Sequence, residues 1–371
     1  MTASQGRTTV KSRSRRLVLA VSALAAGVLL GACSSSPSSN SASTGSGGSG
    51  SKTQLTFVGY GGSGQQGQIE AWEKPYTAQD PSVTFNNTSP ATVAEVKAQV
   101  LAGNIQWDVV NVAPYAAEQD CGTLFDKLSV PTLNPKDFPA GTIGPCYVGN
   151  FTNSPVLSYN VKDFPNPATA PKTIADFFNT KKFPGKRGVV ADLQDGMMEY
   201  PLLADGVKPA DLYPLNVNEA LQTWDTIKSD TIFAPNVGAL QQDVASNQVS
   251  MFILVSSRQL TLLDSGVDIQ PIWQTTVAAL NAFAVPKGDP NLAAAEKFIE
   301  FADQPGPSAK IAELDGVAPI NLDSKPSLSK NAQLVNPFGP DNTGAVVTQN
   351  VQWYAQNNNA DTTILDNWLD G

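Results

Sequence analysis

Apolar and polar residues from position 54 onward follow two alternating spacings. Short apolar runs occupy 55–60, 83–87 and 107–112, and the last of these, "WDVVNV", shows no alternation, as in a strand buried on both faces. Between them, 66–77 and 92–102 place apolar residues every three to four positions, which predicts helices. Strands that alternate with helices in this way predict an α/β fold with a largely parallel sheet.

A second block repeats the pattern after residue 154. Strands are predicted at 155–160, 188–191, 232–234, 249–255, 268–273 and 281–286. Helices are predicted at 173–179, 197–204, 218–229, 240–246, 292–302 and 308–314, with a last helical stretch at 344–368. Trp72, Trp224 and Trp353 fall on apolar helix faces, so we expect them in the core.

The first 53 residues have a different character. A 14-residue apolar run, 17–30, follows five basic residues and is too short for a membrane span. It ends in Leu30-Gly31-Ala32-Cys33, which resembles the lipobox of bacterial lipoprotein signal peptides. The resemblance implies a signal peptide at 1–32, cleavage before Cys33 and a lipid on its sulfur; the alternative is an ordinary secretory signal with an accidental cysteine. Residues 33–53 are mostly Ser, Gly, Ala, Asn and Thr, and predict a disordered tether.

Charge and composition exclude several functions. The formal net charge is −9, and five of the 24 basic residues precede Cys33, so nucleic-acid binding is not expected. The sequence contains no histidine, which excludes Ser-His-Asp catalysis and histidine metal sites. Catalysis by a carboxylate pair stays possible on composition alone. We expect no enzyme activity, no cofactor and no metal.

Two further cysteines, Cys121 and Cys146, lie within the folded part of the chain. In an exported protein an even pair predicts a disulfide, and closing this loop stabilises the fold by about 3 kcal/mol in the chain-entropy model. Two buried free thiols are the alternative.

Residues 62–67, "GSGQQG", fit the dinucleotide-binding pattern G-x-G-x-x-G after a predicted strand. A dinucleotide site also needs an acidic residue at the end of the second strand, but that strand ends in "FNNT". We therefore favour a glycine turn whose backbone approaches a ligand in a cleft. A glycine turn that contacts no ligand is the simpler alternative.

Several segments in order resemble one family. "PLLADGVKPADLYPLN" at 201–216, "FAVPKGDPNLAAAEKFIEFA" at 283–302 and "GVAPIN" at 316–321 are similar to bacterial solute-binding proteins of the spermidine/putrescine class, over about 55–325. The resemblance implies a two-lobed periplasmic-binding-protein-like fold of type II, with the ligand cleft between the lobes. Lobe 1 would comprise 54–152 plus 283–320, and lobe 2 would comprise 153–282 plus 321–371. It also implies a monomer, anchored by lipid to the outer face of the cell membrane, that delivers its ligand to an ABC permease.

The resemblance also implies a set of ligand-binding residues. They are Tyr60, Gly61, Gly62, Ser63, Tyr115, Asn153, Gln194, Asp195, Gly238, Gln241 and Asn281. For Asp195, a helix N-cap is the alternative role. The family's aromatic–x–Asp before its strand at 281 becomes Ala279-Leu280-Asn281, and Arg258 is present nearby in sequence. One aromatic wall and one carboxylate are thus missing, so a polyamine and another small polar solute, such as an amino-acid derivative or an opine-like compound, both stay open.

Three functions follow from these patterns. The leading hypothesis is a lipid-anchored solute-binding protein of an importer. A ligand-sensing module and a secreted carboxylate-dependent hydrolase on the same fold are the alternatives.

Overall fold

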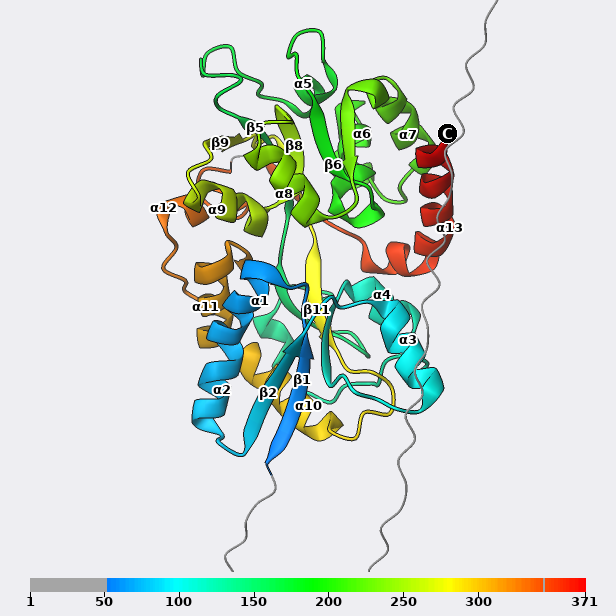
Figure 1. Cartoon of the computed structure of the whole chain (residues 1–371), viewed down its shortest axis with the longest axis vertical. Helices are drawn as coiled ribbons and strands as arrows, with labels where there is room; N and C mark the ends of the chain where they lie inside the picture. Colours follow the sequence, from blue (N-terminus) through cyan, green and yellow to red (C-terminus); the bar gives the residue numbers. More distant parts are fainter. Residues whose placement is uncertain (1–51, 343) are drawn as a thin grey trace, which may run out of the picture. The chain divides into compact units, whose positions relative to one another are not determined.

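Two separate β-sheets, each flanked by helices, organise the chain (Figure 1). The structure is a computed structural model that describes residues 52–342 and 344–371. The predicted signal peptide, the lipidated Cys33 and nearly all of the tether therefore lie outside the described residues. No helix in the described part is both long and apolar enough to cross a membrane.

The first sheet has the order β12-β4-β11-β3-β1-β2, and with its helices it is called the first lobe here. Its strands are β1 (Thr53–Val58), β2 (Val83–Thr88), β3 (Val109–Val112), β4 (Val148–Thr152), β11 (Leu280–Ala284) and β12 (Ala318–Pro319). Its helices are α1 (Gly62–Gln68), η1 (Ile69–Glu73), α2 (Lys74–Gln79), α3 (Val93–Ala102), α4 (Pro114–Gln119), η2 (Pro135–Asp137), α10 (Leu292–Ala302) and α11 (Pro305–Asp315). Trp72 is fully buried against Phe57, Phe151 and Phe283, as expected for a core residue.

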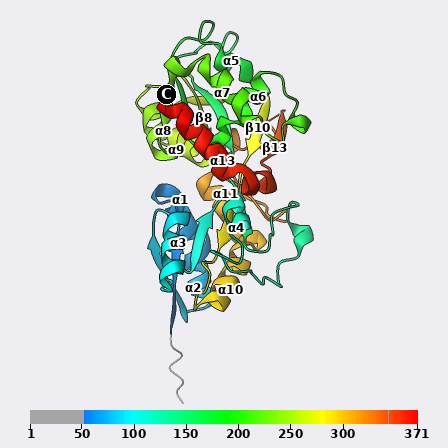
Figure 2. The ribbon, with the colours of Figure 1, turned by 90° about the vertical axis from the view of Figure 1, so that its right-hand side faces the viewer.

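The second sheet has the order β7-β6-β8-β5-β9 and forms the second lobe. Its strands are β5 (Pro155–Asn160), β6 (Arg187–Val190), β7 (Thr231–Ala234), β8 (Met251–Val255) and β9 (Ile269–Pro271). Its helices are α5 (Ile174–Phe178), η3 (Leu193–Met197), α6 (Glu199–Ala204), η4 (Pro209–Asp211), α7 (Val217–Asp225), η5 (Lys228–Asp230), α8 (Val237–Ala245), α9 (Ser256–Asp264), α12 (Lys330–Leu334) and α13 (Val351–Asp370). A parallel pair, β10 (Thr275–Ala278) and β13 (Ala345–Thr348), packs beside β5. Figure 2 shows α13 along the second lobe, with its first turns facing α4.

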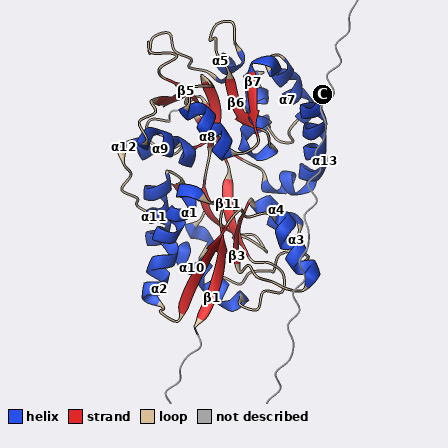
Figure 3. Ribbon diagram, in the orientation of Figure 1, coloured by secondary structure: helices blue, strands red, loops and turns tan. Residues whose placement is uncertain are grey.

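The α/β prediction is confirmed, but three of its details are wrong (Figure 3). Both lobes have mixed sheets, because β11 is antiparallel to β3 and β4, and β5 is antiparallel to β8 and β9. The first helix begins at Gly62, four residues earlier than predicted. Residues 345–348 form a strand instead of the start of the last helix, because they pair with β10.

The chain passes between the lobes at three places. Residues 153–154 join β4 to β5, Ala279 joins β10 to β11, and the segment after β12 leads to α12. The first two crossings touch each other, since the amide of Asn153 donates to the carbonyl of Ala279 over 2.9 Å. The lobe boundaries given by the sequence stay a prediction.

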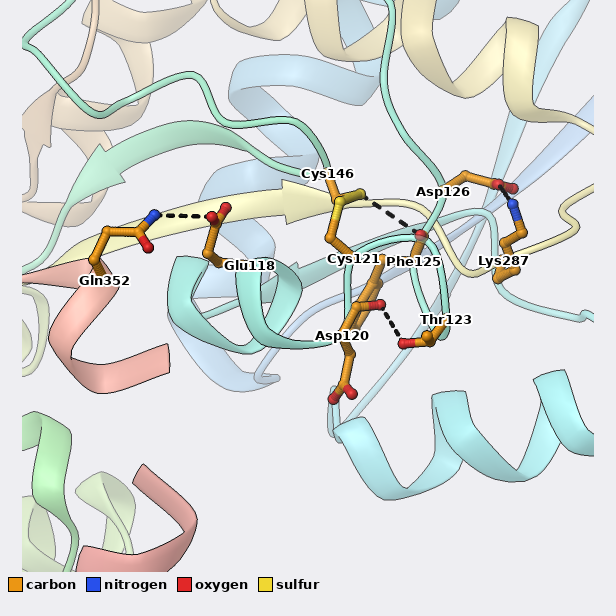
Figure 4. The surroundings of a disulfide bond; sticks show 9 residues. All are labelled: Glu118, Asp120, Cys121, Thr123, Phe125, Asp126, Cys146, Lys287 and Gln352. Atoms are coloured by element: carbon orange, nitrogen blue, oxygen red, sulfur yellow. Dashed lines mark hydrogen bonds and ion pairs between the residues drawn. A yellow bond between two sulfur atoms is a disulfide. The ribbon is translucent and has the colours of Figure 1, made fainter. Parts of the chain in front are cut away.

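Cys121 and Cys146 form a disulfide in the first lobe, with their Cα atoms 5.5 Å apart (Figure 4). It links the segment just after α4 to the segment just before β4, at a sequence separation of 25. Close by, Asp126 pairs with Lys287 over 2.8 Å. These contacts fix the outer side of α4, whose inner side faces the second lobe.

Candidate ligand-binding cavity

A cavity of about 690 Å³ lies between the two lobes. The first lobe contributes the start of α1, the ends of β3 and β4, the start of α4, Leu280 and Asn281 of β11, and the end of α11. The second lobe contributes the ends of β6 and β8, the turn after β6, the start of α8 and one face of α9. Cavities of this size hold small organic molecules. Because the lining residues lie at strand ends in both lobes, their polar groups can meet one ligand.

The turn from β1 into α1 brings backbone close to the cavity. Gly61 and Gly62 have φ angles of 76° and 66°, a conformation that side chains rarely tolerate. The helix then begins at Gly62, so most of the G-x-G-x-x-G motif is helical and is not a phosphate-binding loop. Gly67 has a second role, because a Cβ there would lie 2.1 Å from Asp315 Oδ1. The glycines thus allow the α1 helix to approach α11 at the cavity wall.

An acidic region lies on the turn after β6. Asp192 Oδ1 accepts the amides of Gln194 and Asp195 over 2.8 and 2.9 Å, so Asp192 caps this turn and Asp195 does not. Removal from bulk water raises the pKa of Asp195 well above its ordinary value, and the neighbouring Asp192 carboxylate and a hydrogen bond to it raise it further. Burial also raises the pKa of Asp192, while hydrogen bonds from the turn oppose that rise. Both carboxyl groups therefore favour the protonated form more than exposed carboxyl groups do when no cation is bound.

Two tyrosines and an amide face this acidic region. Tyr60, after β1, keeps 47% of its surface exposed and receives a long 3.5 Å contact from Asn281 Nδ2; its partial removal from water raises its pKa. Asn281 Oδ1 is buried and has no hydrogen-bond partner among the described residues. Tyr115 on α4 stacks on Tyr354 of α13, with ring centroids 5.5 Å apart. Burial, with the Asp192 and Asp195 charges adding to it, raises the pKa of Tyr115, so both tyrosines are neutral hydrogen-bonding rings.

An arginine region lies elsewhere on the cavity wall. Arg258 projects from α9, and a Cβ on Gly62 would lie 3.3 Å from one of its guanidinium nitrogens. Burial lowers the pKa of Arg258, and Asp315 opposes that change. Burial raises the pKa of Asp315 to about 8, with Arg258 acting in the opposite direction. Within the described residues, Arg258 makes no ion pair closer than 4 Å, and it is one of the residues that line the cavity.

Asn153 lines the cavity, but its side chain serves the fold. Its Oδ1 accepts the amide of Ser257 over 3.2 Å, and its Nδ2 donates to the Ser257 hydroxyl over 3.0 Å. Asn153 thereby satisfies a free amide at the start of α9. It holds Arg258 in place from the first crossing between the lobes.

Eight of the eleven predicted ligand-binding residues line the cavity. Gly62, Gly238 and Gln241 do not. Helix α8 begins at Val237, with Asn236 as its cap, so the lining residues are Pro235, Asn236 and Val237, which lie before the predicted pair. Whether the eight contact a ligand stays a prediction.

Other lining residues did not emerge from the sequence. Gln68, Asn111, Ser257, Thr261, Asp264 and Asp315 belong to this group. Asn111 had a readable signal, because it is a polar residue within the apolar run "WDVVNV"; it donates to Gln68 Oε1 over 2.9 Å. Ser63 and Thr261 approach across the cavity at 3.4 Å, which marks where the lobes meet. No group of three acidic or cysteine residues in the described part is placed to hold a metal ion.

The two lobes and the cavity between them define a two-lobed binding protein. The chain belongs to the family of bacterial extracellular solute-binding proteins, whose family model matches residues 71–336. It is 32% identical over 298 residues to the gamma-aminobutyric acid-binding protein of Pseudomonas aeruginosa, covering 78% of this chain and 83% of that protein.

Solved structures agree with this assignment. The structure of the Atu4243–GABA receptor is 31% identical, with a TM-score of 0.75, and the match covers 85% of this chain and 97% of that one. An ABC transporter substrate-binding protein from Bradyrhizobium japonicum is 26% identical, with a TM-score of 0.77, over 85% of this chain and 99% of that one.

These relatives confirm the two-lobed fold, and they confirm that the chain is a solute-binding protein and not an enzyme. The hydrolase alternative is thereby retired. Membership of the family also places the protein outside the cytoplasm. The finer assignment to the spermidine/putrescine class is not confirmed by these matches.

Proposed function

We propose that this protein captures a small zwitterionic ω-amino acid of the γ-aminobutyrate class and delivers it to an ABC permease. The observation that carries the proposal is the presence of opposite charges in one cavity. Asp192 and Asp195 offer an acidic region that forms no ion pair within 4 Å in the described part of the chain, and Arg258 offers a cationic group. A molecule with an ammonium at one end and a carboxylate at the other satisfies both groups.

Neutral groups complete the site for the ammonium. The unpartnered Asn281 Oδ1 accepts a hydrogen bond from it, and the faces of Tyr60 and Tyr115 attract it by cation–π interaction, worth about 0.5–2 kcal/mol. For the carboxylate, Arg258 provides a planar pair of donors. Two relatives named for γ-aminobutyrate support the same ligand class.

A polyamine is the second candidate, because the sequence resembles polyamine binders and because Asp192, Asp195 and two tyrosines suit one ammonium group. Its second ammonium would meet Arg258 or require a different carboxylate, such as Asp315. Repulsion between the second ammonium of a polyamine and the guanidinium of Arg258 opposes binding, so the zwitterion is favoured.

The decisive experiment compares four compounds of similar length. γ-Aminobutyrate carries both charges, butylamine and butyrate carry one each, and putrescine carries two positive charges. Thermal unfolding and calorimetric titration of the complete chain should show saturable binding of γ-aminobutyrate, with stabilisation of about 2.7 kcal/mol at 100 times the dissociation constant. The single-charge compounds should bind at least tenfold more weakly. Binding of putrescine without γ-aminobutyrate would instead support the polyamine candidate.

The membrane attachment and the permease are further parts of the proposal. The lipobox-like segment supports a lipid on Cys33, and the named transporter relative supports a permease partner. Replacement Cys33→Ser should move the protein from the membrane fraction to the medium. A module that feeds a sensor is the alternative, and uptake of labelled γ-aminobutyrate by cells with and without the protein separates the two.

A further inference from the structure

The C-terminal segment reaches the back of the ligand cavity without lining it. Strand β13 pairs with β10, and the amide of Gln349 donates to the carbonyl of Ala278 over 3.0 Å. The next residue, Ala279, is the second crossing between the lobes. Gln349 and Tyr354 are absent from the lining of the main cavity, but both line a separate void of about 30 Å³ behind Tyr115 and Gln194.

The acidic turn is held from behind by these two residues. Gln349 Nε2 donates to the carbonyl of Gln194 over 2.8 Å, and Tyr354 Oη lies 2.9 Å from the carbonyl oxygen of Leu193. Leu193 and Gln194 directly precede Asp195. Gln349 therefore holds the backbone just before Asp195 by a hydrogen bond, and Tyr354 holds it by a hydroxyl whose single proton is shared between the Leu193 carbonyl and Glu199 Oε1.

A fully buried carboxylate organises the same two residues. Glu199 has no exposed surface, and its Oε1 lies 2.6 Å from Tyr354 Oη, 2.7 Å from Tyr213 Oη and 2.9 Å from Gln349 Nε2. Its Oε2 has no partner among the described residues. Three polar partners around Oε1 offset part of the cost of burying this acid, and the same contacts hold Tyr354, Tyr213 and Gln349 in one arrangement.

Tyr354 also reaches the other lobe. Its ring stacks on Tyr115 of α4 at 5.5 Å and 27°, and two residues earlier Gln352 Nε2 donates to Glu118 Oε1 over 2.8 Å (Figure 4). Tyr354 thus contacts both the acidic turn of the second lobe and Tyr115 of the first lobe.

We propose that Glu199, Gln349 and Tyr354 form a buried clamp that positions Gln194, Asp195 and Tyr115, so that the C-terminal segment sets ligand affinity without touching the ligand. These are positioning residues, and the inference rests on the proposed function only for the identity of the ligand. In metal sites, removing partners that orient the ligating side chains changes affinity or activity about 10–100-fold, and we expect the clamp to act by the same kind of positioning.

The test uses Gln349→Ala, Tyr354→Phe and Tyr354→Leu in the complete chain, with γ-aminobutyrate as the probe. Gln349→Ala should weaken binding about tenfold. Tyr354→Phe keeps the stack on Tyr115 and loses only the hydroxyl contacts, so it should retain more affinity than Tyr354→Leu. The control is Trp368→Phe at the far end of α13, which loses the 2.8 Å bond from Trp368 Nε1 to Asp225. It should lower thermal stability without changing the dissociation constant.

Hydrogen exchange without ligand separates the clamp from the ligand assignment. The amides of Gln194 and Asp195, which donate to Asp192, should exchange at least several-fold faster in Gln349→Ala and at the wild-type rate in Trp368→Phe. If the wild type does not bind γ-aminobutyrate, the proposed function fails and the exchange data alone decide on the clamp. Unchanged exchange, or faster exchange with unchanged affinity for a bound ligand, would overturn the clamp.

Discussion

Charge is arranged differently in the acidic region and the arginine region of the cavity. In the acidic region two carboxyl groups lie together, and the nearest charged group behind them is a third carboxylate, Glu199. In the arginine region Asp315 lies near Arg258, but burial raises the pKa of Asp315 to about 8, so at neutral pH it carries only part of a negative charge. In the acidic region, burying the two ionised carboxylates costs free energy until a cation binds. In the arginine region, the charge of Arg258 is already partly balanced by Asp315. We therefore expect the ammonium of the ligand to supply more of the binding free energy than its carboxylate.

The largest expected effect follows from removing the charge of the acidic region. Asp195→Asn should weaken γ-aminobutyrate binding about 100-fold, because a charge-assisted hydrogen bond to the ammonium is lost. Calorimetric titration at pH 8 measures the change. Glu70→Gln is the matched control, because Glu70 also lines the cavity but pairs with Lys74 on the helix surface. Equal effects of both changes would contradict the assignment of Asp195.

The raised pKa of Asp195 makes ligand affinity depend on pH. The free protein holds Asp195 protonated at pH values where the bound ammonium would hold it ionised, so binding releases a proton. Affinity should thus fall as the pH drops below the raised pKa of the pair, by up to about tenfold per pH unit. Titrations in buffers of different ionisation enthalpy measure the proton count. Asp195→Asn should reduce the dependence of affinity on pH. A wild-type affinity that does not change between pH 5 and 8 would contradict the proposed difference between the acidic and arginine regions.

A smaller effect is expected in the arginine region. Arg258→Ala should weaken γ-aminobutyrate binding about tenfold and leave butylamine binding unchanged, because butylamine has no carboxylate. Arg258→Lys should restore only part of the loss, since an ammonium cannot offer a planar pair of donors. If Arg258→Ala weakened both compounds equally, the side chain would act on the fold of α9 and not on the ligand carboxylate.

Local patterns in the sequence predicted the elements but not their pairing. The periodicity at 83–87 and 292–302 gave β2 and α10 closely, because each depends on its own apolar spacing. The antiparallel entry of β11 between β3 and β4 depends on residues more than 120 positions away, which no local pattern records. Helix α1 begins at Gly62, four residues before the predicted start at 66, and the close approach of Gly67 to Asp315 is a contact that local propensity does not record.

The site shows the same limit. Tyr60, Tyr115 and Asp195 were predicted because they follow strands in segments that resemble a known family, and all three line the cavity. The clamp was missed, because Tyr354 and Glu199 are 155 positions apart and each resembles an ordinary helical residue. Only the pairing of β13 with β10 brings them together, and the sequence pattern had placed 345–348 in a helix.

The smallest effect is expected on the stability of the ligand-free protein, and it tests the same difference between the acidic and arginine regions. A carboxyl group whose pKa is higher in the folded than in the unfolded state favours folding at low pH and opposes it as the pH rises through that interval. Asp195 has this sign, so the ligand-free protein carries its cost at neutral pH and not at pH 4. Asp195→Asn should therefore raise the unfolding temperature of the ligand-free protein by a few degrees at pH 7 and leave it unchanged at pH 4. Thermal unfolding at both pH values measures the difference. Arg258→Ala should have the opposite sign above pH 8, where Asp315 is ionised and would lose its neighbouring cation. A loss of stability in Asp195→Asn at pH 7 would show that the two carboxyl groups are already compensated, and the contrast between the two regions would then disappear.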